Sequence, residues 1–305
     1  MGVVTPMFAY YYFFLICEWC KRNVYESSFP SVDMKKLRKV RFPIPPVAVQ
    51  EEVVRVLDKF TALEAELEAE LEAELDCRKR QYEYYRDALL TFDLSPSDGL
   101  CYSPLFSAPF AVEWLPLGEV GEFTRGSGLQ KKDFTTEGVG CIHYGQIYTH
   151  YGTFAFETKT FVSEEFAQKA RKAQCGDLVI ATTSENDEDL CKAVAWLGKE
   201  DVVVSSDACF YTHKMAPKYV SYFFQSTHFQ KQKRAFITGT KVRRVNAKDL
   251  AKIEIPIPPL AVQERIVEIL DKFDTLVNSI SEGLPREIEL RRKQYEYYRD
   301  ALLSF

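Results

Sequence analysis

A segment of about 50 residues occurs twice in this chain with its length preserved. Residues 43–60 read PIPPVAVQEEVVRVLDKF and residues 256–273 read PIPPLAVQERIVEILDKF, so 13 of 18 positions are identical. The sequence QYEYYRDALL stands at 81–90 and again at 294–303, and both blocks recur 213 residues further on. Because the two copies hold the same number of residues between these landmarks, we expect the length of the segment to matter for its function.

Each copy has the pattern of a long helix. Paired prolines at 45–46 and 258–259 suit an extended chain that leads into a first helical turn. The apolar residues that follow are spaced 4, 3, 4, 3 and 4 apart, which is the heptad spacing of a coiled-coil seam. They are Val49, Val53, Val56, Phe60, Leu63 and Leu67, then Val262, Ile266, Ile269, Phe273, Leu276 and Ile280. The first copy predicts a helix from about residue 46 to about residue 92, roughly 70 Å long.

A four-residue unit is repeated inside the first copy, where residues 63–75 read LEAELEAELEAEL. Alternating apolar and acidic residues also fit a strand, but Leu, Ala and Glu are strong helix formers and no β-branched residue interrupts them. Residues 61–76 carry seven acids and no base, which predicts a solvated face that phosphate repels. One LEAE unit more or less changes the helix length by about 6 Å. The second copy reads SISEGLPREIEL here, and Gly283 and Pro285 predict a break or kink.

The segment between the two copies has a different texture. Residues 93–110 hold three prolines and predict a linker. Residues 111–255 alternate short β-branched and aromatic runs, such as DLVIAT and DVVVSS, with turns and with helical stretches such as SEEFAQKARKA. This pattern predicts a complete mixed α/β domain, so the chain as a whole falls in the α+β class.

Residues 1–42 resemble the tail of a second such domain. The sequence TPMFAYYYFF at 5–14 resembles APKYVSYFFQ at 216–225, and SVDMKKLRKVRFPIPP resembles RVNAKDLAKIEIPIPP. The expected order is therefore a domain remnant (1–42), a helical region with the LEAE repeats (43–92), a linker (93–110), a full domain (111–255) and a second helical region (256–305). The apolar run at 8–17 is too short to span a bilayer, and we expect it to be a buried helix or strand.

The most basic stretch closes the full domain. Residues 231–252 have eight lysines and arginines against one aspartate, although the whole chain has a net charge of −5. Residues 238–241 (TGTK) predict a turn, and Arg243 and Arg244 follow directly. Basic side chains beside a small polar turn suit contact with phosphate. The alternative is a solvated helix face.

The sequence has no motif of a catalytic site. It lacks a P-loop, a Gly-x-Gly-x-x-Gly and an Asn-Pro-Pro-Tyr-like methyltransferase motif. Residues 184–190 (SENDEDL) are rich in acids, but we interpret them as a loop rather than a metal site. Cys17 and Cys20 have C-x-x-C spacing without a second pair nearby, so zinc or redox use remains the minor alternative. With no export signal, we expect the eight cysteines to be reduced thiols and the protein to be cytoplasmic.

Taken together, these features resemble the specificity (S) subunit of type I restriction–modification systems. The resemblance rests on IPIPPLAVQERIVEILDKFD, on GTKVRRVNAKDLAKIEIPIPP, on EGLPREIELRRKQYEYYRDALL, and on GDLVIATTSEN and WLGKEDVVVSSDACFY within the domain. It covers nearly the whole chain. One departure matters: this sequence has one complete target-recognition domain where the family has two, so it resembles a half or truncated S subunit.

The resemblance implies a non-catalytic subunit that reads one half of a bipartite double-stranded DNA site. It also implies that the two helices pack as an antiparallel coiled coil and act as a ruler, with LEAE as a length unit; a repeat that arose by slippage and is tolerated is the alternative. Methyltransferase (M) and restriction (R) subunits would dock on it and would carry S-adenosylmethionine, Mg and ATP. The missing half-site would come from a second copy or from a second specificity chain. The competing hypothesis is a degenerate coiled-coil assembly protein that no longer reads DNA.

The candidate DNA contacts are polar loop residues of the full domain, because arginine, lysine, asparagine and glutamine commonly reach base edges and phosphates. The candidate base readers are Arg125, Gln130, Tyr144, Gln146, Thr182, Thr183, Ser184, Asn186 and Ser206. The candidate phosphate contacts are Lys131, Lys132, Thr240, Lys241, Arg243 and Arg244. No catalytic residue and no metal ligand is predicted.

Overall fold

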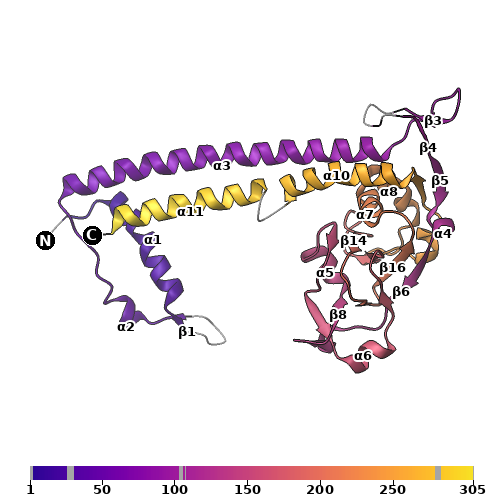
Figure 1. Cartoon of the computed structure of the whole chain (residues 1–305). Coiled ribbons are helices and arrows are strands. Elements are labelled where there is room, and N and C mark those ends of the chain that lie inside the picture. The colour runs from indigo at the N-terminus through magenta and orange to yellow at the C-terminus, as the bar shows by residue number, and fades with distance from the viewer. Residues whose placement is uncertain (1–2, 26–30, 103–105, 107, 279–282, 305) are drawn as a thin grey trace. The chain divides into compact units, whose positions relative to one another are not determined.

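The computed structural model describes residues 3–25, 31–102, 106, 108–278 and 283–304 (Figure 1). It divides into two compact units. Unit 1 holds Met1–Lys79 with Thr275–Phe305, and unit 2 holds Arg80–Asp274. The boundaries between the units therefore fall inside the long helices. The proposed borders at residues 43, 93, 111 and 256 divide the chain by sequence texture instead.

The long helices form where the repeats predict them. Helix α3 runs without interruption through Val47–Leu90, close to the predicted 46–92. The second copy forms two helices, α10 (Leu260–Asn278) and α11 (Leu284–Leu303), and Gly283 is the N-cap of α11. The expected break at Gly283 and Pro285 is thus confirmed, while Ile280 of the predicted seam lies outside the described residues. The helix-forming LEAE units explain why α3 continues where the second copy stops.

In unit 1, α3 packs antiparallel to α11. The rings of Phe60 and Tyr298 stack with centroids 5.8 Å apart, and the Thr61 and Tyr295 hydroxyls hydrogen-bond at 2.8 Å. Further along, Arg292 forms an ion pair with Glu68. Residue numbers rise along α3 as they fall along α11, so the predicted antiparallel coiled coil is confirmed.

In unit 2, α10 packs on the end of α3 by the matching contact. The rings of Tyr85 and Phe273 stack with centroids 5.3 Å apart. Phe273 and Tyr298 stand 213 positions after Phe60 and Tyr85, so the two ring pairs are the same contact made twice.

The leucines of the LEAE units do not all face the seam. Leu71 is only 8% exposed, whereas Leu63, which the heptad pattern places in the seam, is 62% exposed. Residues four apart advance by about 40° round a helix at each step, so a strict four-residue repeat cannot stay on one face. The prediction for Leu63 was therefore wrong.

The remainder of unit 1 is α1 (Pro6–Arg22), α2 (Met34–Leu37) and the short strands β1 (Val24–Tyr25) and β2 (Ser31–Val32). Phe8 and Tyr11 of α1 pack with Leu57 of α3 and Leu303 of α11 in one apolar core. The apolar run at 8–17, predicted to be a buried helix or strand, is helical. Only part of it is buried, because one face of α1 is exposed.

The same hydrogen bonds fix α1 to α3 and the domain helix α7 (Pro217–Gln225) to α10. In unit 1, Gln50 accepts from the Thr5 amide at 2.8 Å and donates to the Pro45 carbonyl at 2.8 Å. In unit 2, Gln263 stands 213 positions later, accepts from the Ala216 amide at 2.9 Å and donates to the Pro258 carbonyl at 2.8 Å.

A tyrosine–carboxylate contact also recurs. The Tyr11 hydroxyl donates to Asp58 at 2.7 Å, and the Tyr222 hydroxyl donates to Asp271 at 2.7 Å. Helices α1 and α7 are therefore attached to their long helices in the same way.

Substitution of Gln263 by alanine should destabilise unit 2. The side chain is 3% exposed, so its loss leaves the partly buried Ala216 amide and the buried Pro258 carbonyl without their partner. We expect a loss of about 2–3 kcal/mol in the free energy of unfolding, measured by urea denaturation. Glu264→Ala, at the neighbouring exposed position, is the control. An equal effect of the two substitutions would contradict this role for Gln263.

Unit 2 is built on two five-stranded sheets. The first has the order β6 (Gly121–Arg125), β16 (Ala208–His213), β12 (Leu178–Ala181), β14 (Ala193–Trp196) and β9 (Phe154–Ala155). The second has the order β11 (Lys172–Ala173), β15 (Val202–Val204), β8 (Val139–Ile142), β10 (Thr160–Val162) and β7 (Phe134–Thr135). Neighbouring strands are antiparallel except for the pairs β14–β9 and β15–β8.

Buried aliphatic and aromatic side chains such as Val179, Val194 and Phe210 form the main core of unit 2. The expected helix SEEFAQKARKA is shorter than predicted, because α6 (Glu164–Lys169) ends at Lys169 and β11 begins at Lys172. Near the predicted linker, β3 (Leu100–Cys101) pairs with β4 (Phe110–Ala111). The first and last strands of the domain, β5 (Glu113–Pro116) and β18 (Glu254–Ile257), pair antiparallel.

Candidate nucleic-acid interface

The candidate residues gather where three strands of the first sheet end or begin. Arg125 closes β6 opposite Cys209, and Ala181 closes β12 opposite Ala208, the first residue of β16. The turn at residues 205–207 leads from β15 into β16 at this edge. Loops at strand ends place side chains on a rigid scaffold, which is where binding residues are usually found.

The turn at 205–207 hydrogen-bonds to three candidate base readers. The contacts run from Tyr144 N to Ser205 Oγ (2.9 Å), from Arg125 Nε to Ser206 O (3.0 Å), and from both Thr182 N and Thr182 Oγ1 to Asp207 O (3.0 Å each). Tyr144 begins α5 (Tyr144–Thr149), which follows β8 of the second sheet. The turn therefore holds loops from both sheets together.

A two-stranded ribbon joins the acidic loop to the basic segment. Strand β13 (Thr183–Ser184) pairs antiparallel with β17 (Arg243–Arg244), so Thr183 lies opposite Arg244 and Ser184 opposite Arg243. The sequence places these two segments about 60 residues apart and gives no sign that they meet. Their pairing puts the candidate base readers Thr183 and Ser184 opposite the candidate phosphate contacts Arg244 and Arg243.

Arg243 is fixed in position by two partners. Its Nε lies 3.0 Å from an oxygen of Asp187, and its Nη1 donates to the Gly239 carbonyl at 2.8 Å. Gly239 has a φ of +88°, which side-chain-bearing residues adopt with strain, so glycine is needed at this turn. Thr240 and Lys241 at its tip are exposed. The predicted TGTK turn is confirmed.

The buried side chain of Lys233 supports the acidic loop at residues 185–190 through hydrogen bonds to its backbone. Lys233 ends α8 (Thr227–Lys233) and is 1% exposed. Its Nζ donates to the carbonyls of Asp187 and Leu190 at 2.7 Å each, and lies 3.4 Å from that of Glu188. The SENDEDL segment is a loop, as interpreted, and its backbone is organised around one ammonium group.

Replacing Lys233 with methionine should remove this support while preserving the aliphatic volume. Loss of the ammonium leaves buried carbonyls without a donor, so we expect a cost of about 3 kcal/mol in the free energy of unfolding. Lys231→Met, at an exposed position of the same helix, is the matched control. Urea denaturation measures both, and equal stabilities would contradict this role.

Exposed basic side chains gather near the end of β6, and the loop at 185–189 brings four acids to the same edge. Arg125, which ends β6, and Lys131 and Lys132, which follow it, are exposed. Exposed Arg171 donates from Nη1 to the Arg125 carbonyl at 2.8 Å. Burial, and then the charge of Lys131, lower the pKa of His143, so this imidazole adds no positive charge at neutral pH. The cationic character therefore comes from lysine and arginine.

Two glutamines predicted to reach DNA are used inside the fold. Gln146 accepts from the His143 amide and donates to Thr160 Oγ1, both at 3.0 Å. Gln130 forms a reciprocal cap with Asp133 at the short helix Lys131–Asp133. The sequence reasoning chose these two residues by type and did not identify the caps.

Arg171 was missed by the sequence reasoning, which placed it in a longer helix. Its amide donates to Ser127 Oγ at 2.8 Å, which brings it beside the end of β6. Tyr148 was also missed; its hydroxyl donates to the Thr183 carbonyl at 2.7 Å. The residue types alone carry no signal that separates these two from other surface residues.

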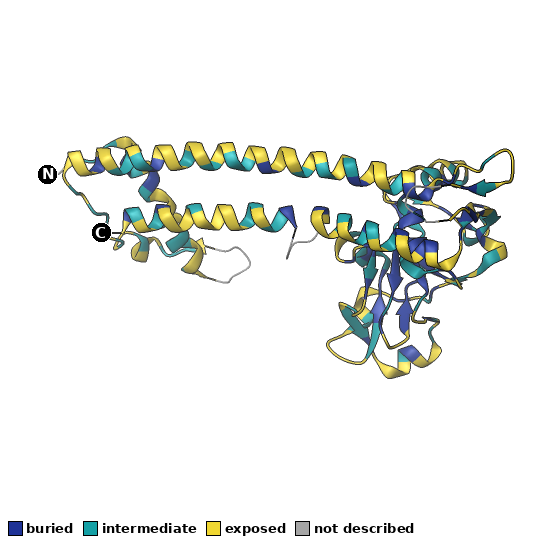
Figure 2. Cartoon of the chain, turned by 45° about the horizontal axis from the view of Figure 1, so that its top comes forward, coloured by how far each residue is buried: buried dark blue, intermediate teal, exposed yellow. Residues whose placement is uncertain are grey.

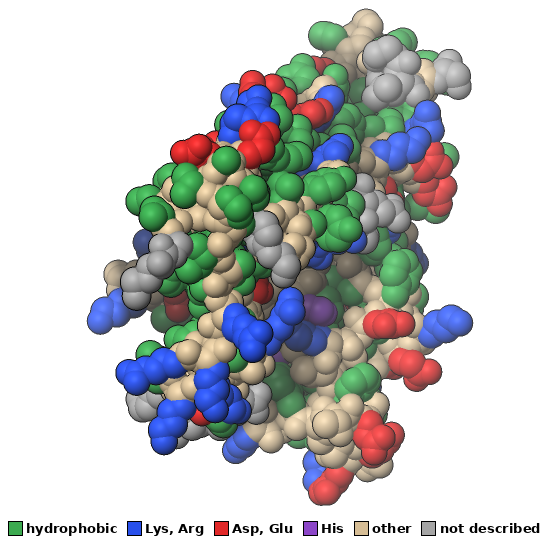
Figure 3. Space-filling view, turned by 90° about the vertical axis from the view of Figure 1, so that its left-hand side faces the viewer, with side chains coloured by type: hydrophobic (Ala, Val, Ile, Leu, Met, Phe, Trp, Pro, Cys, Tyr) green, Lys and Arg blue, Asp and Glu red, His purple; other side chains and the backbone are tan. Residues whose placement is uncertain are grey.

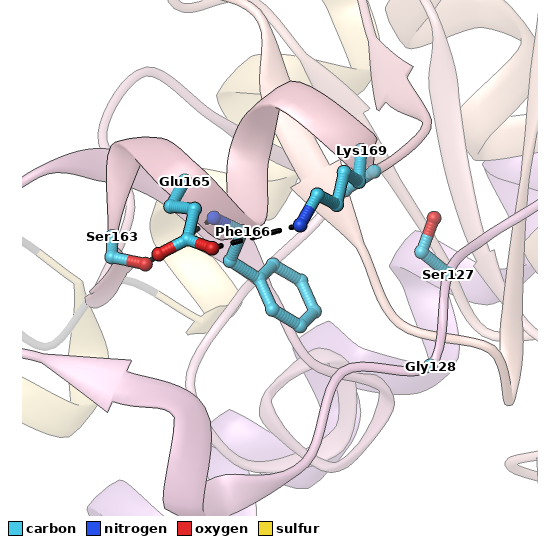
Figure 4. Close-up of a pocket in the computed structure, with 7 residues that line it drawn as sticks. Ser127, Gly128, Ser163, Glu165, Phe166 and Lys169 are labelled. Atoms are coloured by element: carbon cyan, nitrogen blue, oxygen red, sulfur yellow. Dashed lines mark hydrogen bonds and ion pairs between the residues drawn. The ribbon is translucent and has the colours of Figure 1, made fainter.

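An open pocket of about 430 Å³ lies next to this edge (Figure 4). It is lined by Ser127, Gly128 and one face of α6, where Glu165 and Lys169 form an exposed ion pair at 3.6 Å. No histidine or cysteine stands among its lining residues. A shallow pocket of this composition suits an extended polar partner better than an enclosed small molecule.

Within the residues that the structure describes, no group of three or more His, Cys, Asp or Glu side chains is placed to hold a metal ion. Among the same residues, no helix is long and apolar enough to cross a membrane.

The described chain thus combines a mixed α/β domain, which has polar and basic loops at one sheet edge, with long antiparallel helices. The chain matches the family model described as "Type I restriction modification DNA specificity domain" over residues 3–76 and 111–290. It therefore belongs to the family of type I restriction–modification specificity subunits, which are the non-catalytic component of these systems.

The chain is similar to specificity subunits of different lengths. It is 35% identical over 299 residues to the type I restriction enzyme EcoR124I/EcoR124II specificity subunit of Escherichia coli, covering 93% of this chain and 69% of that one. The crystal structure of the HsdS subunit from Thermoanaerobacter tengcongensis matches 98% of this chain and 69% of its own, with a TM-score of 0.53 and 17% identity. A structure solved in work on complex assembly and conformational transition of the type I R-M system gives a TM-score of 0.62 at 19% identity, over 98% and 70%.

Proposed function

We propose that unit 2 reads one half of a bipartite DNA site through the edge built around residues 205–207. The observation that carries this proposal is the pairing of β13 with β17, because it joins the loop at 183–190 to the basic turn at 238–244. Base edges need short polar or planar side chains at close range, and phosphates need cations beside them. Both kinds of side chain meet at this edge.

The proposed roles follow from the position and exposure of each side chain. Arg125, Tyr144, Thr182 and Thr183 are the preferred base readers, and Ser184 and Ser206 support them from the adjoining backbone. Asn186 shapes the loop, because its side-chain amide donates to the Asp189 carboxylate at 2.8 Å and accepts from the Asp189 backbone amide at 2.7 Å. The proposed phosphate contacts are Lys131, Lys132, Thr240, Lys241, Arg243 and Arg244, and Arg171 joins them. Gln130 and Gln146 act indirectly, by fixing the loops that carry their neighbours.

The long helices would dock the methyltransferase and restriction subunits. Those subunits would bring S-adenosylmethionine, Mg and ATP, since no cofactor is assigned to this chain. In this proposal the second half-site would come from a second copy or from another specificity chain. Residues 1–42 are proposed as the remnant of a second domain. The support is that α1 is attached to α3 by the same hydrogen bond that attaches α7 to α10.

Co-expression with the methyltransferase subunit, followed by genome-wide methylation mapping, tests this function. We expect adenine methylation at sites that share one defined half-sequence. A variant with Thr182, Thr183 and Asn186 all replaced by alanine should change or abolish that half-sequence and still co-purify with the methyltransferase. Co-purification without any methylation by the unaltered chain would favour the competing hypothesis of an assembly protein without DNA reading.

A further inference from the structure

A cluster of basic side chains lies in unit 1 between strand β2 and the start of α3. Residues 34–41 read MKKLRKVR and hold no acid. No residue from 31 to 46 is buried, and in Figure 2 this stretch carries the colours of exposed and intermediate residues. Figure 3 faces the side where α2 lies and shows lysine and arginine side chains gathered there. The exposed cations, named the α2 cluster, are Lys35, Lys36, Arg38, Lys39 and Arg41.

Unit 2 forms the same short helix with balanced charges. Helix α9 (Ala247–Leu250) begins and ends 213 positions after α2 (Met34–Leu37), so the two helices are counterparts in the repeat. Residues 247–254 carry two cations and two acids, whereas residues 34–41 carry five cations. The fold of this element therefore does not depend on the positive charge.

Two of the five cations are replaced by acids in the unit 2 copy. Asp249 stands in the place of Lys36 and forms an ion pair with Lys252 at 2.8 Å. Glu254 stands in the place of Arg41 and is exposed. The outer positions of this element thus stay accessible beside the sheets of unit 2, and they differ between the two copies chiefly in charge.

The α2 cluster has no carboxylate to neutralise it. Among the described residues, no acid forms an ion pair with any of its five side chains. Asp33 is used as the N-cap of α2, where its carboxylate accepts from the Lys35 amide at 2.7 Å. The ammonium group of Lys36 lies 5.1 Å from the centroid of the Tyr25 ring. Five like charges within seven residues repel one another, so a bound polyanion would be stabilised here.

The place of the cluster in the repeat matches that of the proposed phosphate contacts. In unit 2, two residues separate β17 (Arg243–Arg244) from α9. In unit 1, α2 follows β2 (Ser31–Val32), and Ser31 stands 213 positions before Arg244. The α2 cluster therefore follows the counterpart of the strand that carries the basic residues in unit 2.

We propose that the α2 cluster binds the phosphate backbone of double-stranded DNA without reading its sequence. The inference rests on the proposed function: unit 2 reads bases, and the cluster in unit 1 adds affinity for the duplex whatever its bases are. Phosphates recur along every sequence, and lysine and arginine contact them without touching base edges. The seven acids at 61–76 repel phosphate, so within unit 1 the contact is confined to the cluster.

The test replaces two cations with the residues that unit 2 has at the same positions, Lys36→Asp with Arg41→Glu. Fluorescence anisotropy of a labelled random-sequence duplex, with the full chain bound to its methyltransferase subunit and across a range of KCl concentrations, measures the affinity. We expect a loss of about 100-fold at near-physiological salt and a slope of log affinity against log salt that is shallower by about 2. The control, Lys199→Asp with Lys214→Glu, makes the same change of net charge at exposed positions of unit 2 and should keep most of the affinity.

Two results would overturn the proposal. The first is the same salt slope for the variant and the control. The second is loss of the methyltransferase subunit from the variant on co-purification, because the cluster would then hold an acidic protein surface. If the charge reversal impairs folding, Lys36→Gln with Arg41→Gln removes the same two contacts and should change the slope equally.

Methylation mapping separates this inference from the proposed function. The variant should methylate the same half-sequence as the unaltered chain, only less completely. An intact half-sequence with an unchanged salt slope rejects the α2 cluster alone. A changed salt slope in a chain that reads no half-sequence rejects the proposed function alone.

Discussion

Deletion of one LEAE unit, residues 67–70, should move the two half-sites of the DNA target closer together without changing their bases. The deletion shortens α3 by about 6 Å, equal to one or two base pairs at about 3.4 Å per step, and turns one end of the helix by about 40°. We expect methylation of the original site to fall about 100-fold or more, and methylation to appear at a site with a gap shorter by one or two base pairs. Methylation mapping of the assembled complex measures both.

The reason lies in the matched spacing of the two repeats. Phe60 and Tyr85 stand 25 positions apart on α3, and Phe273 and Tyr298, their ring partners, stand 25 positions apart in the second copy. The deletion removes four residues from α3 only. Phe60 and Tyr85 can then no longer stack on Tyr298 and Phe273 at the same time. The control keeps the length with Glu66→Gln and Glu70→Gln. An unchanged gap after the deletion would support a repeat that is merely tolerated.

Replacement of both Arg243 and Arg244 with alanine should weaken DNA binding for every sequence. Each arginine that neutralises a phosphate releases counterions, so the slope of log affinity against log salt should become shallower by about 2. At near-physiological salt we expect a loss of about 100-fold. Fluorescence anisotropy of a labelled duplex, with the methyltransferase present and across a range of KCl concentrations, measures the slope.

The control for this pair is Lys231→Ala with Lys248→Ala, which removes two positive charges from the same basic segment but away from the β13–β17 ribbon. It should leave most of the salt dependence in place. If the two double variants behave alike, the effect comes from net charge, and the assignment of Arg243 and Arg244 as phosphate contacts fails.

The helices were predictable because helix formation depends on residues close in sequence and because the same segment occurs twice in the chain. Helix-forming residues, paired prolines and the duplicated landmarks place α3 and the break before α11 within a few residues. The exposure of Leu63 was not predictable from the heptad count, because the four-residue spacing departs from it only gradually.

The edge around residues 205–207, proposed to contact DNA, was harder to predict because it depends on contacts between distant segments. The candidates Arg125, Tyr144 and Thr182 were chosen by residue type, and the turn at 205–207 binds all three. Sequence alone could not pair β13 with β17 or bring Arg171 to the end of β6. It also left Gln146 free, whereas the local cap occupies its amide.

The antiparallel pairing of β5 with β18 has a consequence for how such chains change over time. It sets the point where the chain leaves for the recognition domain beside the point where it returns. A domain whose two ends lie side by side can be exchanged for one of different sequence while the flanking helices keep their geometry. The tracts at 43–60 and 256–273, identical at 13 of 18 positions, provide similar sequence on both sides of that domain. Genetic crossover within these two tracts would replace the domain between them and leave the long helices unchanged.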